Sequence, residues 1–74
     1  MAQSVEEQHR QLLTYREISR RTGIPVPTLR DMRYRGRGPR LFKLAGRVVG
    51  YADEVDRWVQ QQAELTQSGG GGAA

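Results

Sequence analysis

The sequence predicts a small, mainly helical domain that carries one antiparallel β-hairpin. Three observations support this prediction. A capped helical segment precedes Gly23 and a second helical segment follows it, the apolar pattern changes to alternation between residues 42 and 51, and a helical apolar stripe begins at Val55. A chain of 74 residues has room for only one small core, so we expect a single folded domain.

The first predicted helix runs from about Tyr15 to Thr22. Before it, Thr14 and Glu17 have the spacing of a capping box, in which each side chain accepts a hydrogen bond from the backbone N–H of the other residue. Gly23 suits the left-handed residue that follows a helix end. Residues 1–11 are polar and lack an apolar stripe, so we expect a frayed helix or a tail there.

The second predicted helix starts at Val26 or Pro27 and continues to Arg33. Proline is tolerated in a first helical turn because the N–H groups there have no intrahelical acceptor. Leu29 and Met32 are three residues apart, so both face the core. The short, glycine-containing turn between the two helices gives the pair helix-turn-helix dimensions.

A β-hairpin is predicted after the second helix. Phe42 and Leu44 alternate with a lysine, Val49 and Tyr51 alternate with a glycine, and the Ala-Gly pair at 45–46 supplies the turn. Because an isolated hairpin is unstable, we expect the face that carries these four apolar side chains to pack on the helices.

The third predicted helix begins at about Ala52. Val55, Trp58 and Val59 have the i, i+3, i+4 spacing of an apolar stripe, and Leu65 is a candidate for its extension. We interpret Trp58 as a packing anchor rather than a platform for stacked bases. The domain is predicted to span 12–62, between the polar segment at 1–11 and a flexible, glycine-rich tail at 63–74.

Positive charge is concentrated in the middle of the chain. The net charge is +4, but residues 1–14 carry −1, residues 15–47 carry +8 and residues 48–74 carry −3. Eleven of the twelve cations are arginine, whose planar fork matches phosphate groups and guanine edges. A polyanion is therefore the expected partner, and a merely solvated basic face is the alternative.

The composition argues against several other classes of protein. The absence of cysteine removes disulfides and thiolate metal sites and fits a reducing interior. No run approaches the roughly 18 to 20 apolar residues that a membrane span needs. His9 has no second histidine or cysteine with which to share a metal, so we interpret it as solvated. We expect a cytoplasmic protein with no membrane contact, no metal, no cofactor and no enzymatic activity.

A helix pair with a basic second helix, followed by a hairpin, predicts a winged helix-turn-helix that binds double-stranded DNA. In such modules the second helix enters the major groove with its N-terminal residues nearest the base edges. Arg30 has the chemistry for a bidentate contact with guanine. The candidates for contact with base edges are Thr28, Arg30, Asp31 and Tyr34.

Other basic residues suit the DNA backbone and the minor groove. A small turn enters the minor groove where narrowing concentrates negative potential, and this suits Gly46 and Arg47 at the tip of the hairpin. The candidates for phosphate contact are Arg20, Arg21, Arg33, Arg35, Arg37, Arg40 and Lys43.

Several stretches resemble a known family over about Leu12 to Gln61. They are Leu13-Thr14 with Glu17-Ile18, Arg21-Thr22-Gly23-Ile24, Thr28-Leu29-Arg30, Phe42-Lys43-Leu44-Ala45-Gly46-Arg47 and Val55-Asp56-Arg57-Trp58-Val59. These stretches are similar to the MerR-related winged helix-turn-helix of phage excisionases and AlpA-type regulators. The resemblance implies a recognition helix with Thr28 and Arg30 and a wing tip with Gly46 and Arg47. Pro25 departs from it, because a Ser or Thr cap is usual there.

The resemblance also implies a biological task. Excisionases bind side by side on DNA, bend it and steer a phage integrase towards excision without performing catalysis. We therefore expect an excisionase in the cytoplasm of a bacterial host, with double-stranded DNA, an integrase and neighbouring head-to-tail copies of itself as partners.

Two other functions stay open. A small transcriptional regulator of the AlpA or MerR type would occupy a promoter with the same surface. A protein-binding module would instead use the arginines to hold an acidic partner. A footprint on DNA distinguishes one isolated operator from several adjacent repeats near recombination sites.

Overall fold

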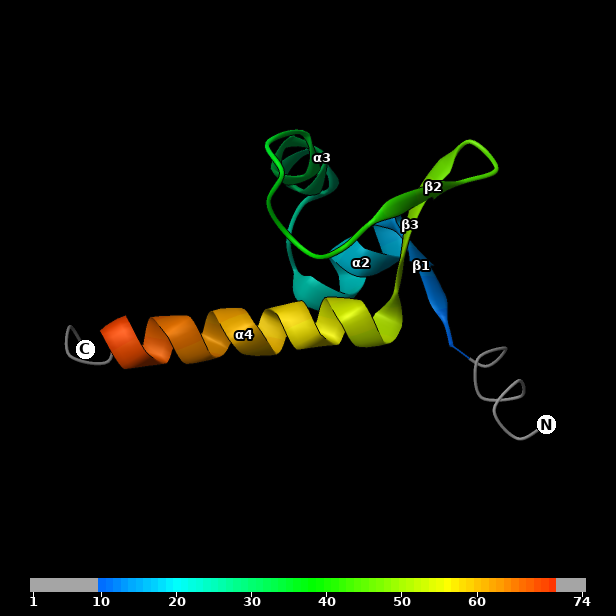
Figure 1. The fold of residues 1–74 in the computed structure, drawn as a ribbon. Coiled ribbons are helices and arrows are strands. Elements are labelled where there is room, and N and C mark those ends of the chain that lie inside the picture. Colours follow the sequence, from blue (N-terminus) through cyan, green and yellow to red (C-terminus); the bar gives the residue numbers. More distant parts are fainter. Residues whose placement is uncertain (1–9, 71–74) are drawn as a thin grey trace.

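The computed structural model describes residues 10–70, which form a small mixed α/β fold of three helices and a three-stranded antiparallel sheet. Within the sheet the strand order is β1-β3-β2. Helix α4 lies along one side of the molecule, and α3 and the tip of the β2-β3 hairpin project from the opposite side (Figure 1). The elements in chain order are β1 (Leu12–Thr14), α2 (Tyr15–Thr22), α3 (Val26–Tyr34), β2 (Phe42–Leu44), β3 (Arg47–Tyr51) and α4 (Ala52–Gly70).

Helix α2 begins and ends where the sequence predicts. The Thr14 backbone N–H donates to the Glu17 carboxylate at 2.9 Å, and the Glu17 N–H donates to the Thr14 hydroxyl at 3.2 Å. At the other end Gly23 has φ of 81° and donates its N–H to the Ser19 carbonyl. The predicted capping box and left-handed glycine are therefore both confirmed.

Helix α3 also matches its prediction and runs one residue further, to Tyr34. Pro25 precedes it in an extended conformation, without a side-chain hydrogen bond to the helix. Leu29 is 1% exposed, and Met32 packs against the core cluster. The buried core cluster joins α2, α3, the sheet and the start of α4, and consists of Leu13, Ile18, Leu29, Ala52 and Val55.

The hairpin turn falls at the predicted pair. Ala45 has φ of 52° and Gly46 has φ of 81°, and the flanking residues Leu44 and Arg47 are paired in the sheet. Two successive residues with positive φ are typical of a type I′ turn, whose twist matches that of the strands. Glycine tolerates this conformation, whereas alanine pays a steric cost for it.

Strand β1 has no counterpart in the sequence prediction. It pairs antiparallel with β3, so that Leu13 lies opposite Gly50 and Thr14 opposite Val49. Only one of its three side chains is buried, so the segment carries no alternating pattern long enough to predict a strand. Strand β3 of the hairpin is thus the central strand of a three-stranded sheet, between β1 and β2.

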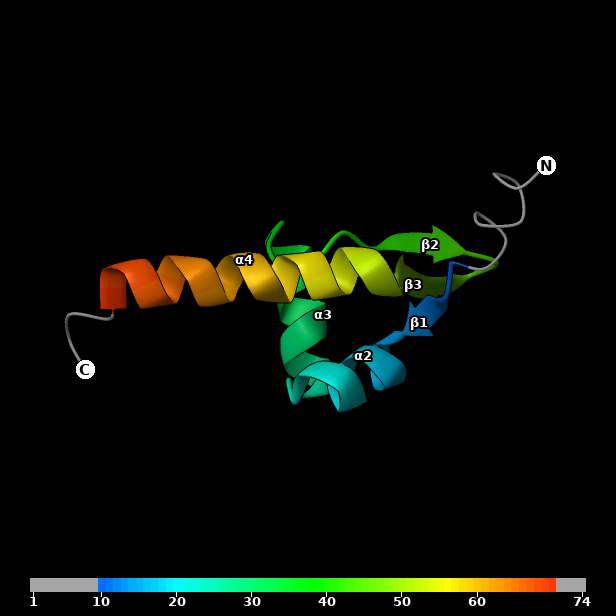
Figure 2. The same cartoon turned by 90° about the horizontal axis from the view of Figure 1, so that it is seen from below.

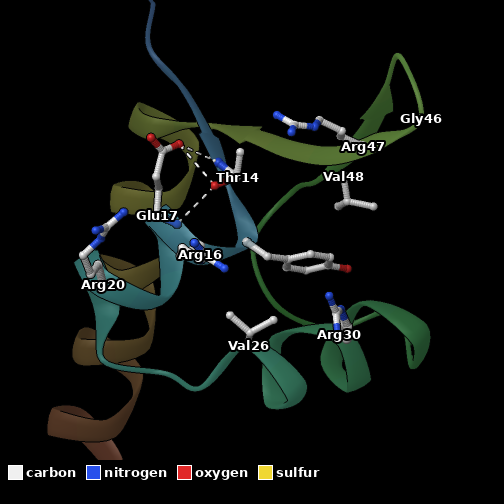
Figure 3. A pocket seen from close by; sticks show the side chains of 10 residues that line it. Thr14, Arg16, Glu17, Arg20, Val26, Arg30, Gly46, Arg47 and Val48 are labelled. Atoms are coloured by element: carbon white, nitrogen blue, oxygen red, sulfur yellow. Dashed lines mark hydrogen bonds between the residues drawn. The ribbon is translucent and has the colours of Figure 1, made fainter.

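The predicted packing face of the hairpin is wrong. Leu13 belongs to the main core cluster and lies opposite Gly50 in the sheet, so both are on the face that is turned towards the helices. Val48 projects from the same face (Figure 3). A Cβ atom on Gly50 would come within 2.5 Å of the Leu41 side chain and 3.8 Å of Val55. Because Gly50 has no side chain, Leu41 and Val55 can pack against this face of the sheet. The alternation of apolar residues along the hairpin does not predict this packing.

The four apolar side chains of the predicted face lie on the other side of the sheet. There the Phe42 and Tyr51 ring centroids are 5.5 Å apart, and the Arg10 guanidinium covers the Tyr51 ring at 3.8 Å. Val49 is 6% exposed, whereas Leu44, near the turn, is 47% exposed. This face forms a small second cluster outside the main core.

Helix α4 differs from its prediction in length and in burial. Val55 is fully buried, but Val59 is 41% and Leu65 is 67% exposed, so the apolar stripe packs on the core only at its start. The half of α4 that carries Leu65 extends beyond the other elements (Figure 2). Trp58 is half-buried beside the loop that carries Pro39, outside the core cluster, which does not fit its prediction as an anchor.

The predicted boundaries of the domain change accordingly. Residues 63–70 are helical rather than part of a flexible tail, because the helical ladder satisfies their backbone groups and 63–65 are good helix formers. Gln11 joins the fold, since its carbonyl accepts from the Ala52 N–H at 2.8 Å. The remaining parts of the predicted terminal segments, including His9, lie outside the described residues.

Candidate nucleic-acid interface

An open groove separates α2 and α3 from the hairpin, and we call it the arginine groove (Figure 3). Four arginines line it: Arg16 and Arg20 from α2, Arg30 from α3, and Arg47 from β3. The Arg47 side chain projects from the opposite face of the strand to Val48, at the edge of the groove (Figure 3). Among the described residues, none of these four guanidinium groups has a carboxylate partner within 4 Å. The groove is completed by Thr14, Tyr15, Glu17, Val26, Gly46 and Val48.

Three parts of the fold set the geometry of this groove. The capping box holds Glu17 at the start of α2, so the one acid of the groove is engaged with backbone and hydroxyl groups of Thr14. The Arg30 guanidinium lies 5.5 Å from the centroid of the Tyr15 ring, within cation–π range. The turn at Gly46 ends the groove at the tip of the hairpin. The groove combines unpaired positive charge with an aromatic and aliphatic wall.

Arg16 and Tyr15 belong to the groove, although sequence reasoning did not select them. Arg16 and Arg20 are four residues apart on α2, which places them on the same helix face. That spacing was the available signal for Arg16. Tyr15 gave no comparable signal, because only the folded chain places its ring under Arg30.

The predicted residues of α3 face three directions. Arg30 lies on the flank of the helix that faces the arginine groove. Asp31 and Tyr34 lie away from the buried Leu29, and Tyr34 is 90% exposed. Thr28 is also exposed, on the flank away from Arg30. The structure therefore presents the four base-edge candidates on the exposed part of one helix, but not in one direction.

Asp31 is engaged by a residue predicted to contact phosphate. The Arg35 Nε group donates to Asp31 Oδ2 at 2.9 Å, and the two residues are one helical turn apart. Both side chains are more than half exposed. Part of the Arg35 charge is thus neutralised by a neighbour in the last turn of α3.

The loop after α3 gathers three further phosphate candidates. Arg33, Arg37 and Arg40 line a hollow in which Gly36 has φ of 73° and Gly38 has φ of 88°. Positive φ is what glycine adopts without strain, so the two glycines allow the loop to turn. Separately, Lys43 is exposed on β2, opposite Val48.

Arg21 is turned away from this basic surface. Its Nε and Nη2 atoms donate to the two carboxylate oxygens of Asp56, at 2.8 and 3.0 Å, and join α2 to α4. The Arg21 hydrogen bond and charge hold the pKa of the Asp56 carboxyl below its ordinary value. The expected phosphate contact of Arg21 therefore competes with an ion pair already formed in the fold.

A second ion-pair cluster lies at the start of α4. Arg10 donates to both oxygens of Asp53, at 3.1 and 3.2 Å, and its Nη2 lies 3.9 Å from the Glu54 carboxylate. The same guanidinium covers the Tyr51 ring. Arg10 and Asp53 are 43 positions apart, so the sequence alone does not reveal this pair.

Paired and unpaired arginines lie on different parts of the molecule. Within residues 10–70, the arginines around the arginine groove and the loop hollow have no carboxylate within 4 Å, whereas the acids at the start of α4 hold Arg10 and Arg21. A surface of unpaired guanidinium groups is suited to binding an extended anion. Comparison of the chain with protein-family models, curated proteins and solved structures finds no match.

Proposed function

We propose that the chain binds double-stranded DNA as a winged helix-turn-helix. Helix α3 enters the major groove and presents Thr28, Arg30, Asp31 and Tyr34 to base edges. The hairpin, with Gly46 and Arg47 at its tip, reaches the adjacent minor groove.

One observation carries this proposal. The unpaired arginines of the arginine groove come from α2, α3 and the hairpin, while Asp53 and Asp56 at the start of α4 are paired with other arginines. The helix and hairpin that would approach DNA also project from the same side of the molecule (Figure 1). An extended polyanion complements this surface better than a small anion does.

Phosphate binding defines the first test. If the surface neutralises about four to six phosphates, the logarithm of the affinity falls against the logarithm of salt concentration with a slope of about −4 to −5. Fluorescence anisotropy with a labelled 25-base-pair duplex at several salt concentrations measures this slope. A slope near zero, or no binding at low salt, contradicts the proposal.

The finer proposal is an excisionase that bends DNA and directs an integrase towards excision. It rests on the resemblance of the helix pair, the hairpin stretch and the Trp58 region to the MerR-related family of excisionases. In this role, copies bind side by side and head to tail. The protein performs no catalysis itself.

A footprint combined with a recombination assay tests this role. On DNA that flanks its own coding region, we expect several adjacent protected repeats, and with the neighbouring integrase we expect more excision product. Circular permutation of the duplex measures bending. A single isolated operator with altered transcription would support the regulator instead. Binding to acidic proteins but to no duplex would support the protein-binding module.

A further inference from the structure

The exposed side of α3 contains an anion where the proposed function calls for cations. Asp31 is the only acidic residue in the helix, and its side chain is 57% exposed. It lies one helical turn after Pro27 and three residues before the exposed Tyr34, on the side away from Leu29. A carboxylate at this position repels phosphate, so it weakens sequence-independent attraction to DNA.

The ion pair with Arg35 fixes how this carboxylate is presented. Arg35 Nε takes Oδ2 at 2.9 Å, and no hydrogen bond from the described residues reaches Oδ1. One oxygen is thus held within the helix surface, while the other remains an acceptor. The pair is also less repulsive towards a polyanion than an isolated carboxylate, because the arginine charge lies beside it.

The chemistry of base edges limits what such an acceptor recognises. In the major groove only cytosine N4 and adenine N6 present amino donors. Adenine places the N7 acceptor next to its donor, and this acceptor repels a carboxylate. Cytosine has no acceptor on that edge, so a carboxylate oxygen is suited to its amino group.

We infer that Asp31 is a specificity-determining residue that selects a cytosine in the bound duplex, and that Arg35 is its positioning residue. This inference rests on the proposed DNA-binding function and names one nucleobase that the protein recognises. Asp31 acts differently from the unpaired arginines. Its charge lowers the affinity for most DNA sequences, and its carboxylate favours those with cytosine at the contacted position.

Selection from a duplex library with a randomised 20-base-pair region tests the inference on the full chain. We expect the wild-type protein to enrich one position in cytosine by about tenfold over the other bases. Asp31→Asn is expected to lose this preference and to bind unselected duplex more tightly than the wild type. Glu64→Gln is the matched control, because it removes one exposed negative charge from α4. It is expected to keep the cytosine preference.

The role of Arg35 is tested by two measurements, the cytosine preference and the helical circular dichroism, because a purely structural residue would change the second. Arg35→Gln is expected to weaken the cytosine preference to about threefold while helical circular dichroism stays unchanged, because the carboxylate is no longer held. Arg35→Lys restores part of the preference by restoring the charge. If Asp31→Asn loses helical signal, Asp31→Ser provides the same test with a hydroxyl that accepts and donates.

The possible outcomes distinguish the role of Asp31 from the proposed DNA-binding function. Loss of the cytosine preference in Asp31→Asn but not in Glu64→Gln supports the inference. An unchanged selected sequence in Asp31→Asn, or wild-type binding without any cytosine preference, overturns it and leaves DNA binding intact. Failure of the wild-type chain to bind any duplex overturns both.

Discussion

Arginine has different surroundings on the two sides of this molecule. Around the arginine groove, Arg20 and Arg47 have no carboxylate within 4 Å among the described residues. At the start of α4, Arg10 and Arg21 are each held by an aspartate. The number of cations in the sequence is therefore larger than the number available to bind a partner, because some arginines form ion pairs that join elements of the fold.

The largest expected effect on duplex binding comes from removing two arginines of the arginine groove, compared with removing two arginines at the start of α4. Arg20→Ala with Arg47→Ala is expected to weaken duplex binding by about 100-fold, because each lost charged hydrogen bond is worth roughly 1.5 kcal/mol. Arg10→Ala with Arg21→Ala makes the same change in net charge and is expected to weaken binding by less than about threefold. Anisotropy titrations at one salt concentration measure both.

The salt dependence of the same variants sharpens the result. The groove variant is expected to reduce the steepness of the salt slope by about two, one for each lost phosphate contact. Equal losses of affinity in the two double variants would show that net charge, rather than the position of the unpaired arginines, controls binding.

A second pair of variants compares the two ends of the α4 stripe. Val55→Ala removes methyl groups from a fully buried site and is expected to lower the free energy of unfolding by about 2 kcal/mol. Val59→Ala changes a side chain that is 41% exposed and is expected to cost less than about 0.5 kcal/mol. Urea denaturation followed by circular dichroism gives both values. A large loss in Val59→Ala would mean that the exposed half of α4 is covered in solution.

The hairpin tip offers a smaller effect of opposite sign. Ala45 has φ of 52°, so Ala45→Gly is expected to raise the free energy of unfolding by about 0.5 kcal/mol, because relief of strain exceeds the entropic cost of glycine. The same denaturation experiment measures it. Gly46→Ala is the counterpart, since Gly46 has φ of 81°, and it is expected to destabilise the protein. Stabilisation by Gly46→Ala would contradict the turn geometry.

The smallest effect concerns pH and the exposed pair of Arg21 and Asp56. Hydrogen bonds from Arg21 lower the pKa of Asp56 below its ordinary value of 3.8. The pair therefore stabilises the fold above that pH, and the contribution is lost as pH falls through the lowered pKa. We expect the wild type to have a slightly higher Tm than Asp56→Asn at pH 6, and the difference to close towards pH 2. Thermal unfolding at several pH values measures this difference, and Arg21→Ala should abolish it in the same range.

Local signals were sufficient for the elements whose determinants lie close together in the chain. The capping box at Thr14 and Glu17, the left-handed Gly23 and the turn at 45–46 each depend on neighbouring residues, and all three are confirmed. The sheet face and Trp58 were predicted wrongly, because apolar periodicity says which residues share a face but not what covers that face.

The candidate site shows the same division. Arg20, Arg30 and Arg47 were selected for their charge, and all three line one groove, with the Arg47 side chain at its edge on the outer face of β3. Arg21 was selected on the same ground, but the fold commits it to Asp56. Tyr15 was not selected, because nothing in the sequence places it under Arg30.

The amino-acid sequence alone determined the two short helices, the position of the hairpin turn and the strong positive charge of residues 15–47. These properties depend on hydrogen bonds and steric limits between near neighbours, or on composition. Only the tertiary structure decided the third strand, the length of α4 that packs, and which arginines stay unpaired. These depend on contacts between residues that are distant in the chain, whose partners are set when the core forms.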